Sequence, residues 1–81
     1  MTKLDSVQDL RSEHEWDISE IVGKDHTYVE EECLDVVRWD FGSTSLWISS
    51  SENGWLAYGM TLTPKRQKLL EELVGSKIDF S

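Results

Sequence analysis

Side chains that commonly carry out chemistry are scarce in this chain. It holds one cysteine, Cys33, and two histidines, His14 and His26, which are too few and wrongly spaced for a structural zinc site. A nucleophilic thiol needs a nearby histidine and an electropositive setting, whereas Cys33 directly follows three glutamates. We therefore expect an inert thiol, no metal site and no cofactor.

One tripeptide, Asp40-Phe41-Gly42, matches the metal-binding tripeptide of protein kinases. The glycine-rich loop, the lysine strand and the catalytic loop that accompany it in kinases do not occur in the sequence. No glycine-rich turn leads into a helix to hold a phosphate, and the acidic residues do not follow the spacing of a calcium loop. The match is interpreted as coincidental, so no catalytic residue is assigned and the chain is predicted not to be an enzyme.

The net charge is strongly negative and unevenly distributed. Of the formal charge of −8, residues 1–53 contribute −9 through 13 acidic and 4 basic side chains, and residues 54–81 contribute +1 through 3 acidic and 4 basic ones. Such a domain is repelled by nucleic acids and by anionic membranes. The charge therefore predicts no direct contact with nucleic acid or membrane, and favours a basic protein partner.

Length and cysteine content limit the architecture and the compartment. A chain of 81 residues is expected to form one domain, residues 1–81. A single unpaired thiol is typical of a reducing compartment, and no apolar stretch resembles a signal peptide or a bilayer-spanning segment. We expect a cytoplasmic location.

The N-terminal third predicts one or two short helices. Leu4, Val7 and Leu10 recur at steps of three residues, which indicates a helix from about residue 5 to 15 capped by Asp5. Asp17 could begin a second short helix that ends at Gly23. For residues 17–33, helix plus loop and β-hairpin both remain open.

The C-terminal half carries the clearest fold signals. Alternating apolar residues from about 35 to 62 predict a three-stranded, or four-stranded, antiparallel β-meander. A C-terminal α-helix begins at Thr63-Pro64 and ends at Gly75, and it packs against the meander. Together with the N-terminal helices, this pattern predicts the α+β class. The tail, with Ile78 and Phe80, is expected to pack on the core.

The register of the second hairpin decides which aromatic side chains share a face. We favour a three-residue loop, residues 52–54, over a two-residue Asn53-Gly54 turn, because it gathers the aliphatic positions on one face. That face would hold Leu46, Ile48, Leu56, Tyr58, Met60 and Leu62. Trp47 and Trp55 would lie on the opposite face, which the N-terminal helices either cover or leave open as an aromatic patch.

These patterns predict a non-enzymatic protein-interaction module. In size and charge alone, the chain resembles the small acidic inhibitor proteins of phages and bacteria, such as DNA mimics. The predicted partner is a basic protein, such as a nucleic-acid-processing enzyme, steered by carboxylates and anchored by tryptophans. The predicted partner-binding residues are Glu30, Glu31, Glu32, Asp35, Asp40, Trp47 and Trp55.

A second function remains open. The chain could be a self-associating structural or regulatory protein that uses the tryptophan-rich sheet face as a dimer interface. The sequence is therefore compatible with a monomer or a homodimer.

Overall fold

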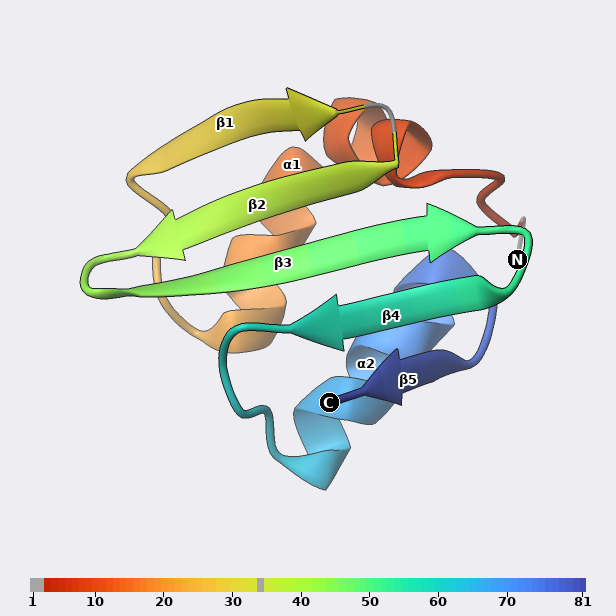
Figure 1. The fold of residues 1–81 in the computed structure, drawn as a ribbon. Coiled ribbons are helices and arrows are strands. Elements are labelled where there is room, and N and C mark those ends of the chain that lie inside the picture. The colour runs from red at the N-terminus through yellow and green to blue at the C-terminus, as the bar shows by residue number, and fades with distance from the viewer. Residues whose placement is uncertain (1–2, 34) are drawn as a thin grey trace.

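The computed structural model describes residues 3–33 and 35–81, and for residues 28–33 it describes the backbone alone. In this part of the chain, two helices cover one face of a five-stranded sheet (Figure 1). The elements are α1 (Val7–Val22), β1 (Tyr28–Cys33), β2 (Val36–Phe41), β3 (Thr44–Ser51), β4 (Gly54–Tyr58), α2 (Pro64–Val74) and β5 (Ile78–Phe80). The predicted α+β class is confirmed. No helix among the described residues is long and apolar enough to cross a membrane.

The sheet extends the predicted meander by one strand at each end. Strands β1 to β4 run antiparallel in sequence order, and β5 adds parallel to β4 after the crossover through α2. Ile78 is buried, so the tail packs on the core as predicted, and it does so as an edge strand. Glu71 on α2 accepts the Ile78 backbone N–H at 2.8 Å, which ties the strand to the helix before it.

The predicted N-terminal helices are present as two helical stretches joined at a kink in α1. Helix α1 begins after Ser6, not Asp5, and ends at Gly23, which adopts the left-handed conformation (φ +84°). His14 has non-helical dihedrals (φ −132°, ψ 31°). Asp17 does not begin a new helix; its carboxylate lies 2.7 Å from Nδ1 of His14. The β-hairpin alternative for residues 17–33 is wrong, because α1 runs through residue 22 and β1 pairs with β2.

The kink in α1 lies where the sheet binds the helix backbone. The indole N–H of Trp39, a fully buried residue of β2, donates to the Glu15 carbonyl at 3.1 Å, one residue beyond His14. A side-chain donor that binds a helix carbonyl in this way is a common cause of bending. At the start of α1, the Val7 N–H donates to the buried Ser50 hydroxyl at 3.1 Å, which satisfies one of the unpaired amides of the first turn.

The predicted register of the β3–β4 hairpin is wrong by one residue. Ser51 pairs with Gly54 and Ser50 with Trp55, so the turn consists of Glu52 and Asn53 alone. This register places Trp55 on the core face beside the helices. Burying a tryptophan removes more apolar surface from water than burying Leu56, which now lies on the other face, so burial favours the observed pairing.

The core lies between the sheet and both helices. Its buried apolar residues are Leu4, Val7, Leu10, Ile18 and Val22 from the N-terminal segment and α1; Val37, Trp39, Phe41, Leu46, Ile48, Trp55, Ala57 and Ile78 from the sheet; and Leu62, Leu70 and Val74 from α2 and the residues before it. Helix α2 has the predicted ends: Thr63 accepts the Arg66 N–H at 3.3 Å, Pro64 occupies the first turn, and Gly75 (φ +76°) follows the last one. Leu69 on the same helix is exposed.

Candidate functional site

The outer sheet face is the side of the sheet that neither described helix covers (Figure 1). Three planar side chains form a row across it in register: Arg38 on β2, Trp47 on β3 and Tyr58 on β4. The Arg38 guanidinium carbon lies 5.2 Å from the Trp47 ring centroid. The Trp47 and Tyr58 rings are nearly parallel, at 6° and 6.1 Å between centroids. Such cation–π and aromatic contacts stabilise a sheet surface.

Arg38 and Asp40 pair with each other on the outer sheet face. Asp40 Oδ1 lies 2.9 Å from Arg38 Nε and accepts the Ser45 hydroxyl at 2.8 Å. The indole of Trp47 lies against Gly59, where a Cβ would approach Trp47 Cδ1 to 2.7 Å. The register partner of Trp47 is Tyr58, so the indole reaches Gly59 diagonally. Asp40 and Trp47 therefore belong to a surface whose groups already bind each other.

The predicted partner-binding residues do not gather in one place. Trp55 is only 7% exposed and lies in the core, so its predicted role as a surface anchor is wrong, for the register reason given above. Asp35 lies exposed between β1 and β2, where its carbonyl accepts the Ser50 N–H at 3.0 Å. The side chains of Glu30, Glu31 and Glu32 lie outside the described residues, and their predicted role remains a prediction.

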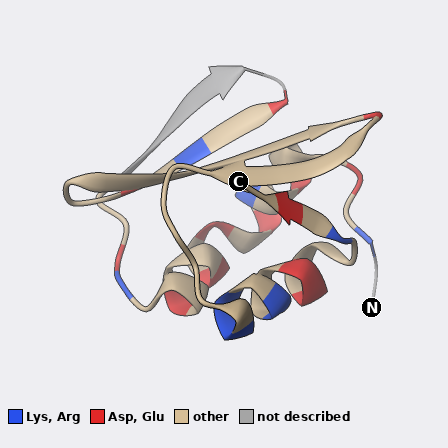
Figure 2. Ribbon diagram, turned by 60° about the horizontal axis from the view of Figure 1, so that its bottom comes forward, with Lys and Arg blue, Asp and Glu red and all other residues tan. Residues whose placement is uncertain are grey.

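Helix α1 presents a surface that the sequence reasoning missed. The acidic α1 face consists of the half-buried Asp9 and the exposed Glu13, Trp16 and Glu20, with the kink at His14 between its two halves. Trp16 is 63% exposed, more than any other large apolar side chain described. Five acidic residues and one basic residue give α1 a formal charge of −4. Figure 2 shows acidic segments along α1 and basic ones at the start of α2.

A signal for Trp16 was present in the sequence. At about 100° per residue, a side chain nine positions after Val7 lies about 180° around the helix from it. Trp16 therefore falls opposite the buried stripe that contains Val7 and Ile18. The sequence reasoning missed this because it treated Trp16 as flanking a separate helix that began at Asp17.

Three polar side chains hold the loop after α1 against the helix. The His26 backbone N–H donates to Ser19 Oγ at 3.2 Å, and Ser19 Oγ shares a second hydrogen bond with Nδ1 of His26 at 2.6 Å. The other ring nitrogen, Nε2, lies 3.5 Å from Glu15 Oε1. The His26 side chain is only 4% exposed and packs 4.4 Å from the Trp16 ring, between centroids.

The Ser19–His26–Glu15 cluster has the residue types of a hydrolase triad, but its hydrogen bonds suit a structural role. A nucleophilic serine needs an oxygen that can reach a substrate, whereas Ser19 is 5% exposed and its oxygen accepts a backbone N–H of the loop it holds. The cluster fixes residues 23–27 and supports the Trp16 ring from within.

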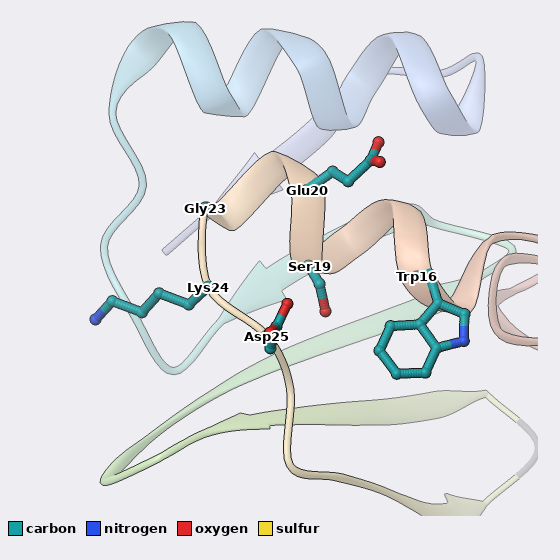
Figure 3. Close-up of a pocket in the computed structure, with 6 residues that line it drawn as sticks. All are labelled: Trp16, Ser19, Glu20, Gly23, Lys24 and Asp25. Atoms are coloured by element: carbon teal, nitrogen blue, oxygen red, sulfur yellow. The ribbon is translucent and has the colours of Figure 1, made fainter.

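A shallow recess opens beside this cluster. It encloses about 460 Å³ and is lined by Trp16, Ser19, Glu20, Gly23, Lys24 and Asp25. In Figure 3, Asp25 projects from the loop toward Ser19, whereas the Lys24 amino group points away from the other lining side chains. Among the described residues, no group of three or more histidine, cysteine or acidic side chains could hold a metal ion.

Comparison with known proteins gives no relative from which a function could be transferred. No protein-family model matches the chain, and neither a curated protein nor a solved structure matches it. The functional argument therefore depends on the geometry and charge described above.

Proposed function

We propose that the chain is a non-enzymatic interaction protein that binds a basic protein through its acidic α1 face. The observation that carries this proposal is Trp16, a 63% exposed residue on a helix of formal charge −4. Tryptophan is among the residues most enriched at binding hot spots, and surrounding charges govern association rate and partner choice. The acidic residues on the same helix therefore favour a partner with a positively charged surface.

A protein that processes nucleic acid is the partner class that best complements this surface. Such proteins carry clustered lysines and arginines where they contact phosphates. An acidic surface of similar extent can occupy that region, and occupation would inhibit the partner. The outer sheet face supports such a role less well, because the charges of Arg38 and Asp40 already neutralise each other there.

The test combines affinity capture with matched charge reversals. The tagged chain captures partners from its native cell, and the dissociation constant of a captured protein is then measured at several salt concentrations. Glu13→Lys and Glu20→Lys, each made singly, should weaken binding and flatten its salt dependence. The control, Glu52→Lys, reverses a charge in the exposed β3–β4 turn and should have a smaller effect. Reversal of Glu30, Glu31 and Glu32 tests whether the glutamate run contributes.

Competition distinguishes the partner class. If the captured protein uses its nucleic-acid-binding surface, duplex DNA or RNA should displace the chain. Binding that survives the α1 reversals with an unchanged salt slope would contradict the proposal. Binding that is salt-dependent but insensitive to nucleic acid would support a basic partner and would exclude a partner that binds through its nucleic-acid-binding surface.

A second candidate function is self-association through the outer sheet face. The observation in its favour is the uncovered Trp47–Tyr58 pair. Sedimentation at two protein concentrations separates the candidates. A dimer that Trp47→Ser dissociates would favour self-association, and a monomer at both concentrations would exclude it over that range.

A further inference from the structure

We infer that the recess beside Trp16 receives an arginine side chain of the partner. This inference rests on the proposed function, and it specifies the chemistry of one contact within that interface. An arginine would lay its guanidinium against the exposed surface of the Trp16 indole and direct its N–H groups toward the carboxylate of Asp25, while Glu20, whose carboxylate is turned toward α2 in Figure 3, contributes negative charge at the opposite rim. Both of these residues line the recess.

The indole is held ready for such a contact. One side of Trp16 packs on His26, whose ring is fixed by Ser19 and faces Glu15. The remaining 63% of the residue's surface faces solvent. Because the ring is supported from within, binding does not need to order it, which removes part of the entropic cost of association.

The carboxylates of the recess are available to a new cation. Within the described part of the chain, neither Glu20 nor Asp25 has a hydrogen bond or ion pair through its side chain. Lys24, the basic residue among those lining the recess, directs its amino group away from the other side chains (Figure 3). The recess side chains carry one net negative charge, from Glu20, Asp25 and Lys24, and the acidic α1 face adjoins them.

Arginine fits this arrangement better than lysine or an apolar side chain. A guanidinium is planar, stacks on an indole, and presents several N–H donors to carboxylates at once. An ammonium is a compact, strongly hydrated charge that gains less from the flat indole surface. An apolar side chain would leave the carboxylates unpaired in a recess that is open to water.

The experiment uses the full chain with blocked peptides as probes. In a Trp47→Phe background, the two other indoles, Trp39 and Trp55, are buried, so accessible emission comes mainly from Trp16. A hexaarginine peptide should change this emission saturably, and a hexacitrulline peptide, neutral and of similar shape, should not. Hexalysine should bind about two- to fivefold more weakly than hexaarginine, the range expected for an exposed cation–π contact.

Variants that each remove one negative charge distinguish binding in the recess from nonspecific electrostatic attraction to the acidic protein. Calorimetry should show that Trp16→Leu weakens hexaarginine about two- to fivefold. Asp25→Asn and Glu20→Gln should each weaken it about twofold, as for exposed ion pairs. The control Glu52→Gln removes the same charge from the β3–β4 turn and should leave the dissociation constant nearly unchanged.

Two outcomes would overturn the inference. One is that Glu52→Gln weakens hexaarginine as much as Asp25→Asn does, and the other is that hexalysine binds as tightly as hexaarginine. The proposed function can survive either result. If the captured partner remains sensitive to Trp16→Leu and to the Glu13 and Glu20 reversals while either of these outcomes holds, only the recess inference fails. If the reversals also have no effect, both fail.

Discussion

The placement of two tryptophans can be tested by the same substitution at each. Trp55 is 7% exposed in the core, whereas Trp16 is 63% exposed on α1. A tryptophan that is almost fully buried hides roughly 200 Å², which at about 25 cal/mol per Å² corresponds to about 5 kcal/mol. For Trp16 roughly a third of that area is hidden, corresponding to about 2 kcal/mol. Trp55→Ala should therefore cost about 3 kcal/mol more than Trp16→Ala.

Urea unfolding followed by far-UV circular dichroism measures both costs without depending on tryptophan emission. A domain of this size has a total stability of about 4–12 kcal/mol, so Trp55→Ala will leave the native state weakly populated. Trp55→Phe keeps the chain folded and should cost about 1 kcal/mol or more, from the ring area lost. If Trp16→Ala destabilises the protein as much as Trp55→Ala does, the observed β3–β4 register is wrong.

Three further predictions concern local structure. Gly59→Ala should lower the unfolding free energy by more than about 2 kcal/mol, because a Cβ there would lie 2.5 Å from a β3 carbonyl at φ +99°. The control Gly42→Ala, at φ +70° with open space around it, should cost only about 1 kcal/mol, and equal costs would contradict the close approach. Ser19→Ala should lower the unfolding free energy by about 1–3 kcal/mol and speed amide hydrogen exchange in residues 23–27, because the His26 amide and ring lose their partner. Unchanged exchange rates would show that Ser19 does not hold this loop. Thr63→Ala should cost about 1 kcal/mol in urea unfolding through loss of the α2 cap, and no change would show that the cap contributes nothing.

Elements whose signals are local in sequence were predicted accurately. Helix α2 begins after Thr63 and ends at Gly75, as expected, because the cap, the proline and the left-handed glycine each act on backbone within a few residues. The antiparallel strands between residues 36 and 58 follow from alternation of apolar side chains. Gly23 also ends α1 as expected.

Features that depend on contacts between distant segments were not predicted. The residues of the β3–β4 turn are compatible with loops that differ in length by one residue. The observed loop is the one that buries Trp55 under the helices. The turn residues themselves carry no information about that burial. The geometry of α1 at its kink also depends on a distant segment, because the indole of Trp39 on β2 donates a hydrogen bond to the Glu15 carbonyl beside the kink.

By itself, the sequence determined the charge of this protein and the presence of four tryptophans, because composition does not depend on folding. Only the tertiary structure decided which tryptophans of the sheet lie in the core. A one-residue difference in strand register reverses the face of every side chain, so Trp55 entered the core. Trp16 stayed outside because the core-facing stripe of α1 lies on the opposite side of the helix. The proposed binding surface therefore moved from the sheet to α1, while the expected charge of the partner remained the same.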